Sequence, residues 1–189
     1  MRAKPLEIFV IAEQFYWAGE MLVRVPYEAA AGNPYYMIGR GLPNMQAAAI
    51  ACRAFSLELY FKCLIRIGRK PPTWGHNLVD LFNAIGVRPQ AAIKRYFRQN
   101  IQEVRAYLER EYGARGRPTL KIDFDDTLSG SKDAFQMMRY LYEKGIPPNT
   151  GWMADPILDG ARQVILDKHP DWKDLRQTPF AESILRSRG

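Results

Sequence analysis

Apolar residues recur at intervals of three and four positions along most of the chain, which is the spacing of one buried helix face. A first helix is predicted from about Pro5 to just before Pro26. Glycines and prolines between positions 31 and 43 predict a loop, after which Asn44 caps a second helix that Gly68 stops. Because small residues early in this second helix let a neighbour approach closely, we expect it to be the central helix.

Four further helices are predicted from the same periodicity and its interruptions. They are expected over about 76–86, 89–113, 127–144 and 156–168. Residues 120–124 alternate like a strand but have no second strand to pair with, so an extended loop is expected there. The chain is therefore expected to be an all-α single domain, with a bundle of five to six helices over 1–169 and a polar C-terminal tail over 170–189.

The composition fits this single folded domain. The chain has 189 residues, 47% of them hydrophobic, which argues against disorder, collagen-like repetition and a tandem array. Cys52 and Cys63 lie eleven positions apart in one expected helix, roughly 16 Å at 1.5 Å per residue, too far for a disulfide. Free thiols suit a reducing compartment, and the apolar runs are too short for a secretory signal or a membrane span. We expect a cytoplasmic protein that does not enter a membrane.

The net charge of +7 is unevenly distributed. Residues 1–118 carry 17 basic and 9 acidic side chains, a net charge of +8, whereas residues 119–189 carry 10 and 11, a net charge of −1. The stripe of Arg95, Arg98 and Arg105 is the candidate RNA-binding surface, and a solvated helix face is the alternative. Sequence-specific DNA binding is not expected.

Metal and cofactor sites are not expected. Two histidines and two cysteines do not provide a zinc-binding pattern, and no glycine-rich loop joins a strand to a helix. The acidic cluster of Asp123, Asp125 and Asp126 is expected to cap a helix rather than to hold a cation.

Glu58 is the most informative polar residue, because it falls on the side of the second helix that should be buried. A buried carboxylate needs partners. Lys62 lies one turn further on, at the spacing of an ion pair, and His76 follows in a segment that is able to fold back toward this helix. A structural role for His76 at the helix start is weighed against catalysis.

Two segments carry a resemblance to a known family. Ala54-Phe-Ser-Leu-Glu58-Leu-Tyr-Phe-Lys62, followed by Gly75-His76-Asn-Leu78, resembles the signature of the HEPN family, the higher eukaryote and prokaryote nucleotide-binding domains. Phe135-Gln-Met-Met-Arg139-Tyr140-Leu-Tyr142-Glu143 is similar to the ending of some prokaryotic members. The resemblance implies an antiparallel helical bundle that forms a homodimer. It also implies that Glu58, Lys62, His76, Arg139, Tyr140 and Glu143 form one buried polar cluster.

Many members of this family are metal-independent ribonucleases that use an arginine followed by a polar residue, and a histidine with four to six residues between it and the arginine. Here Arg139 and Tyr140 are followed at those positions by Lys144, Gly145 and Ile146, so the motif is absent there. Arg69 with His76 and Arg162 with His169 match the spacing elsewhere, each with six residues between.

The leading expectation is a non-catalytic or divergent HEPN-like module that binds RNA or a cognate protein partner, in stress or phage defence. One alternative is a ribonuclease toxin of a toxin–antitoxin pair. It would use Arg162 with His169, or Arg139 with Tyr140 and Glu143. The other alternative is a structural homodimerisation module.

Aromatic residues in excess of what a small core absorbs point to an interface. Those expected to be exposed are Trp17, Tyr27, Tyr35, Tyr36, Trp74, Trp152 and Trp172. The segment 31–43 or the segment 152–156 is expected to contribute to a dimer contact.

Overall fold

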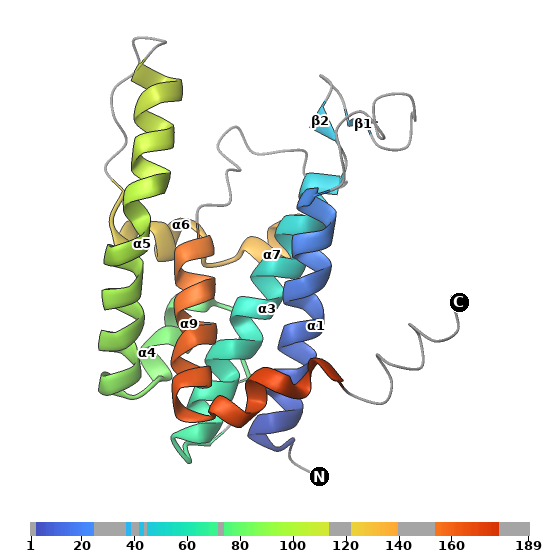
Figure 1. The fold of residues 1–189 in the computed structure, drawn as a ribbon, viewed down its shortest axis with the longest axis vertical. Coiled ribbons are helices and arrows are strands. Elements are labelled where there is room, and N and C mark those ends of the chain that lie inside the picture. The colour runs from blue at the N-terminus through green and yellow to red at the C-terminus, as the bar shows by residue number, and fades with distance from the viewer. Residues whose placement is uncertain are drawn as a thin grey trace.

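The computed structural model describes residues 3–24, 37–38, 42–43, 45–71, 74–113, 122–139 and 154–177. Most of these residues are helical (Figure 1). The helices are α1 (Pro5–Arg24), α3 (Met45–Ile67), α4 (Leu78–Ala84), α5 (Val87–Gly113), α6 (Phe124–Gly130), α7 (Ala134–Arg139), α9 (Asp155–Lys168) and the 3₁₀ helix η2 (Pro170–Gln177). The all-α prediction is confirmed at this level.

The core is built around α3, as its small residues predicted. In Figure 1, α3 lies between α1 and α9, and α5 lies on the far side of α9. The approach of α1 to α3 is so close that a Cβ atom on Gly19 would lie 2.8 Å from Cγ of Arg53. Gly160 of α9 has the same role against α5, where a Cβ would lie 3.2 Å from the Tyr96 ring.

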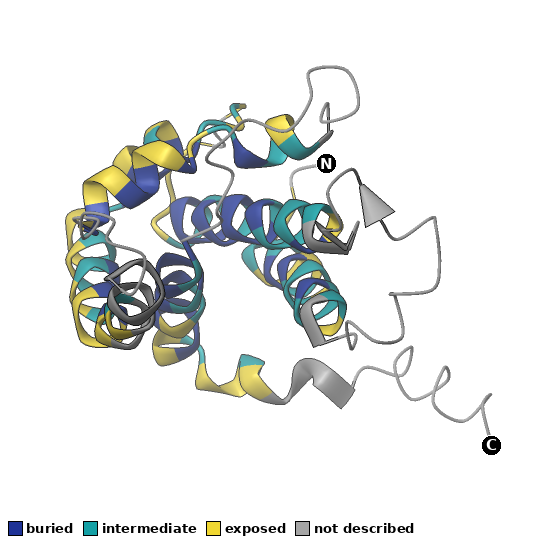
Figure 2. Cartoon of the chain, turned by 90° about the horizontal axis from the view of Figure 1, so that it is seen from above, coloured by how far each residue is buried: buried dark blue, intermediate teal, exposed yellow. Residues whose placement is uncertain are grey.

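Apolar side chains fill the space between these helices. Figure 2 shows buried residues gathered on the sides of the helices that face one another. The largest fully buried side chains include Phe9, Leu57, Tyr60, Phe61 and Phe97. Burial of this kind stabilises the fold by roughly 1.5–3 kcal/mol for each large apolar side chain.

The predicted helix over 127–144 is wrong in both its start and its continuity. Asp123 accepts a hydrogen bond from the backbone N–H of Asp126 at 2.8 Å, and this N-cap starts α6 at Phe124. The backbone N–H of Ser131 then bonds back to Thr127 and Leu128, so a turn over 131–133 separates α6 from α7. Phe124 is therefore helical and not part of an extended loop.

Two other boundaries differ from the sequence prediction. The α4 helix is capped by Asn77, whose side chain accepts from the N–H groups of Val79 and Asp80, so His76 precedes the helix. The segment expected to be a loop over 31–43 contains a two-residue ladder of β1 (Met37–Ile38) and β2 (Leu42–Pro43), with Ile38 opposite Leu42.

The start of the predicted polar tail also packs on the helices. Trp172 of η2 lies 5.4 Å from the Phe9 ring and stacks on His169 with ring centroids 4.0 Å apart. The expectation that Trp172 is exposed is therefore wrong. Trp17 is likewise partly buried, in edge contact with Tyr16. No helix among the described residues has the length and apolarity that a bilayer crossing requires.

Candidate functional site

Glu58, Lys62 and His76 meet as the sequence predicted. Glu58 on α3 is buried, with only 1% of its side chain exposed. Lys62 Nζ donates to Glu58 Oε1 at 2.7 Å, and Nδ1 of His76 lies 3.0 and 3.1 Å from the two carboxylate oxygens. Because a carboxylate accepts hydrogen bonds, the proton of this contact belongs to His76 Nδ1. The carboxylate thus fixes two basic side chains beside each other.

His76 itself is not buried, because half of its side chain remains exposed. Its ring lies 6.4 Å from the Phe135 ring of α7, and Phe135 stacks on Phe55 of α3 at 4.7 Å. The α7 helix therefore packs beside the predicted cluster. The side chain of Arg139 and the residues Tyr140 and Glu143 lie outside the described residues, so their place in the cluster stays a prediction.

Arg162 and His169 each have another partner within the chain. The guanidinium of Arg162 forms a bidentate contact with Glu13 of α1, through Nε at 2.7 Å and Nη2 at 2.9 Å. His169 lies at the C-terminal cap of α9 and stacks on Trp172. Seven residues of helix separate the two Cα atoms by roughly 10 Å. Both side chains therefore make contacts within the chain, Arg162 with Glu13 and His169 with Trp172.

Arg162 belongs to a polar network between α1, α3 and α9 that the sequence reasoning missed. The Tyr60 hydroxyl donates to Glu13, and the Tyr16 hydroxyl donates to Asp159 at 3.0 Å. Burial and the neighbouring Glu13 raise the pKa of Tyr60, and burial raises the pKa of Asp159. Burial alone would lower the pKa of Arg162, but the hydrogen bonds and charge of Glu13 outweigh it and raise that pKa.

The network continues toward the start of α9. Arg53 of α3 donates to Glu20 of α1 and, at 2.8 Å, to Asp155 of α9. Its Nε atom is buried without a hydrogen-bond partner among the described residues. These contacts link three helices with charges, so their evident effect is to fix the packing of the helices. The sequence offered one signal of this network. Glu13 with Tyr16, and Asp155 with Asp159, are three and four positions apart, so each pair puts polar groups on one helix face.

The predicted arginine stripe borders a groove between α5 and α6 with a volume of about 760 Å³. Arg98 and Arg105 line it, and Arg95 lies exposed on α5 away from it. The other charged lining residues are Lys94, Asp123, Asp125 and Asp126. The groove therefore has three cationic and three acidic side chains. A phosphate chain entering it would meet equal numbers of both signs, which removes much of the expected attraction.

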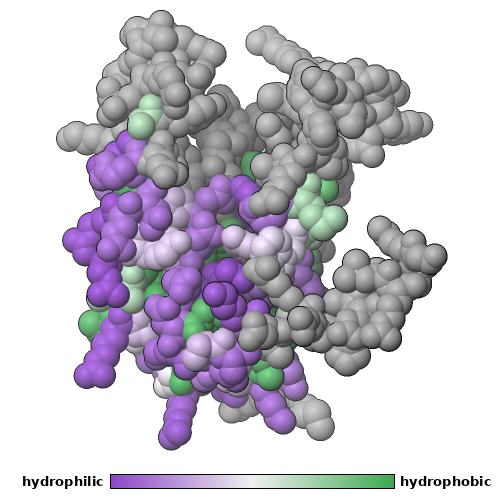
Figure 3. All heavy atoms as spheres, in the orientation of Figure 1, coloured by the Kyte–Doolittle hydropathy of each residue, from purple (hydrophilic) through white to green (hydrophobic). Residues whose placement is uncertain are grey.

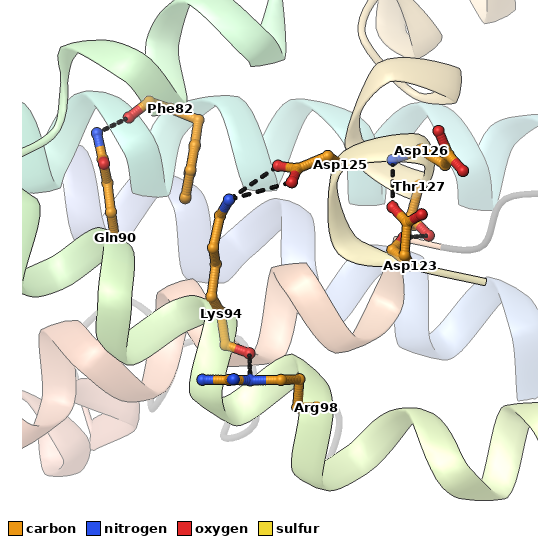
Figure 4. Close-up of polar contacts among 8 residues, drawn as sticks. All are labelled: Phe82, Gln90, Lys94, Arg98, Asp123, Asp125, Asp126 and Thr127. Carbon is orange, nitrogen blue, oxygen red and sulfur yellow. Dashed lines mark hydrogen bonds and ion pairs between the residues drawn. The ribbon is translucent and has the colours of Figure 1, made fainter.

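The cations of this groove already have partners (Figure 4). Lys94 Nζ pairs with Asp125 at 2.9 Å, and Arg98 Nε donates to the Lys94 carbonyl at 3.3 Å. Arg105 donates to the Ile122 carbonyl at 2.7 Å. The surface over α5 is mostly hydrophilic in Figure 3. The lining of the groove between α5 and α6 combines cations with carboxylates.

The acidic cluster of α6 acts as the expected cap. The backbone N–H of Asp126 bonds to Asp123 and lowers the pKa of Asp123, while the side-chain hydrogen bond with Asp123 raises the pKa of Asp126. Asp125 pairs with Lys94. Among the residues that the structure describes, no three potential metal-ligating side chains are grouped to hold an ion.

Three of the aromatic residues expected at the surface, Trp17, Trp74 and Trp172, lie in the described part of the chain. Of these, only Trp74 is exposed, with 92% of its surface in contact with solvent. Tyr27, Tyr35, Tyr36 and Trp152 lie outside the described residues, as do most of the segments expected to form a dimer contact. No protein-family model, curated protein or solved structure matches the chain.

Proposed function

We propose that the chain is a divergent HEPN-like antiparallel bundle that binds RNA in the cytoplasm and does not cleave it. The contact of Glu58 with Lys62 and His76 supports the resemblance, because it joins the two halves of the signature at hydrogen-bond distance. A function in stress or phage defence follows from the resemblance alone.

The observation that carries RNA binding is a set of exposed cations without acidic partners. Among the described residues, carboxylates pair with Arg53, Lys62, Lys94 and Arg162. Other basic side chains are in contact with water and form no ion pair with a carboxylate in the described part of the chain. They include Arg66, Arg69, Lys70, Arg95 and Arg98. Unpaired surface cations on a chain of net charge +7 attract a phosphate backbone and release its counterions.

We propose that the chain does not cleave RNA because both Arg162 and His169, the candidate catalytic pair, already have partners. Arg162 is engaged by Glu13 at two atoms, and His169 is stacked on Trp172. A nuclease would need both side chains to leave these contacts and reach one phosphate. The ribonuclease toxin alternative is therefore less favoured than binding.

The test is fluorescence anisotropy of a labelled RNA oligonucleotide titrated with the full chain in a chelating buffer, with the RNA run on a gel afterwards. We expect saturable binding that weakens steeply with salt, and intact RNA. Cleavage that His169→Ala abolishes would instead support the toxin. An oligonucleotide that shows no binding in low salt would refute the proposal.

A second candidate is homodimerisation, favoured by apolar side chains on the outer side of α1. Ile11 and Met21 are exposed there, and Phe15 packs edge-on against Phe55 of α3. Exposed apolar residues along one helix are typical of a contact surface. Sedimentation equilibrium checks this: we expect a dimer that Ile11→Glu converts to a monomer, and a wild-type chain that stays monomeric contradicts it.

A further inference from the structure

The Trp74 side chain is almost fully exposed to solvent and does not pack in the core. It is the most exposed large apolar side chain among the described residues, at 92%. A Cβ atom built on the following Gly75 would meet nothing within 4 Å, so the backbone beside the indole is open as well. An indole has a large aromatic face and gains when that face is covered. A ligand that covers Trp74 is therefore the natural explanation of its exposure.

The surroundings of Trp74 are basic. From position 59 to position 79 the chain has no acidic residue and four basic ones. Together with Trp74 and Lys132, these define the Trp74 surface: Lys62, Arg66, Arg69, Lys70, Trp74 and Lys132. Lys62 pairs with Glu58, whereas among the described residues no carboxylate pairs with the other four cations of this surface, in contrast to Lys94 in the groove between α5 and α6.

Chain connectivity and two hydrogen bonds limit how far apart these residues lie. Lys70 and Trp74 are four residues apart, so their Cα atoms are separated by about 14 Å at most. The Lys132 carbonyl accepts a hydrogen bond from the N–H of Leu78 at 3.0 Å, which brings the turn before α7 to the end of the same segment. Lys62 is fixed from the other side by Glu58. The surface is thus anchored at both ends by contacts with the core.

Arg69 occupies a backbone position that an arginine does not favour. The end of α3 forms a Schellman motif, in which the N–H of Lys70 bonds to the Ile65 carbonyl and the N–H of Arg69 bonds to that of Arg66. Arg69 has φ 58°, in the left-handed region where glycine is the usual residue. Arg69 thus places a charged side chain at a position where the backbone conformation favours glycine.

We propose that the Trp74 surface binds single-stranded RNA, with an unpaired base stacked on the Trp74 indole and neighbouring phosphates held by Arg66, Arg69 and Lys70. This inference rests on the RNA-binding function proposed above and names its site. Stacking on an aromatic side chain within a cationic surface is how proteins hold single strands with little sequence preference. A base within a duplex is already stacked and paired, so a duplex is not expected to cover Trp74.

A polypeptide is the competing partner for an exposed tryptophan. Tryptophan and arginine are enriched at protein interfaces, but lysine is depleted there. Three of the five cations of the Trp74 surface are lysines, namely Lys62, Lys70 and Lys132. Lysine is an ordinary phosphate-binding residue, so the composition favours the nucleic acid.

The experiment measures the affinity of the full chain for a labelled oligouridylate and for an RNA duplex of equal length. Trp74→Ala is expected to weaken oligouridylate binding by about fivefold to a hundredfold, and Trp74→Phe by less because it keeps a ring. Val87→Ala, which also truncates an exposed apolar side chain, is the matched control and should leave the affinity unchanged.

Arg69→Gly provides a variant whose loss of binding does not come from unfolding. It removes the cation and relieves the left-handed backbone, so its melting temperature should rise while its affinity for oligouridylate falls. Its plot of log affinity against log salt should be shallower than that of the wild type by about 0.7, the value of one phosphate contact on a single strand. Lys173→Gln, at an exposed lysine of η2, is the matched charge control.

The outcomes separate this inference from the function on which it rests. A wild-type chain that binds no oligouridylate overturns both, and leaves Trp74 as an anchor for a protein. Wild-type binding that Trp74→Ala and Arg69→Gly leave intact overturns the site alone. Loss of binding in Arg95→Gln with Arg98→Gln, but not in Trp74→Ala, would move the site to α5.

Discussion

Arg162→Ala tests whether the network between α1, α3 and α9 holds the helices together. The substitution removes two hydrogen bonds to Glu13, at 2.7 and 2.9 Å, and the contact of the guanidinium with the Tyr16 ring at 5.1 Å. Glu13 then keeps the Tyr60 hydroxyl and the Trp17 indole N–H as donors but loses its opposite charge. The result is a largely buried carboxylate with two neutral partners.

The expected cost is worked from this geometry. Removing one partner of a buried ion pair destabilises a protein by about 3–5 kcal/mol, and a hydrogen bond to a charged group is worth about 1.5–3 kcal/mol. Arg162 and Glu13 each keep 16% of their side chain exposed, so water relieves part of the penalty. We therefore expect a loss of about 2–4 kcal/mol in the free energy of unfolding, or about 5–15 °C in melting temperature.

Urea unfolding followed by far-UV circular dichroism measures this loss. The matched control is Lys94→Ala, which breaks the exposed pair with Asp125 and should cost about 0–1 kcal/mol. Glu13→Leu and Arg162→Met combined with Tyr60→Phe should recover much of the stability, because apolar residues replace both charges and the buried hydroxyl that donates to Glu13 is removed with them. A loss below about 1 kcal/mol in Arg162→Ala would refute the reasoning, since an exposed surface pair gives up to about that much.

Three further predictions use the same measurement. Glu58→Ala should cost about 2–3 kcal/mol, because Lys62 and His76 lose their shared acceptor; an unchanged midpoint would contradict this. Asn77→Ala should cost about 1 kcal/mol through the lost N-cap of α4, and a cost near zero would mean that the cap is not formed in solution. Burial raises the pKa of Asp159, so the folded chain holds that proton more tightly and stability falls as pH rises through the raised pKa. The free energy of unfolding of Asp159→Asn, relative to that of the wild type, should therefore be higher at neutral pH than at about pH 4. An equal difference at the two pH values would contradict this.

The helices themselves were largely predictable from the sequence, because their periodicity and end signals are local. The ends of α3 and α9 were predicted at Gly68 and Pro170, although the left-handed residue that closes α3 is Arg69. The break between α6 and α7 was not predictable in this way. There the apolar periodicity continued across the turn, and the side-chain cap by Asp123 decided the start of α6.

The candidate site divides along the same line. The pairing of Glu58 with Lys62 is a contact within one helix, and their spacing alone predicted it. The pairing of Arg162 with Glu13 joins residues 149 positions apart, which no local pattern encodes. The arginine stripe on α5 was equally visible in the sequence, but the carboxylates that face it come from α6.

The sequence by itself thus determined the helical class, the central position of α3 and the buried charge at Glu58, because each depends on residues within a few turns of one another. Only the tertiary structure decided which charges are available. It joined Arg162 to Glu13 and placed α6 opposite the arginines of α5, while it left Trp74 and the cations around it in water. The physical reason is that the energy of a charge depends on which side chains surround it in space.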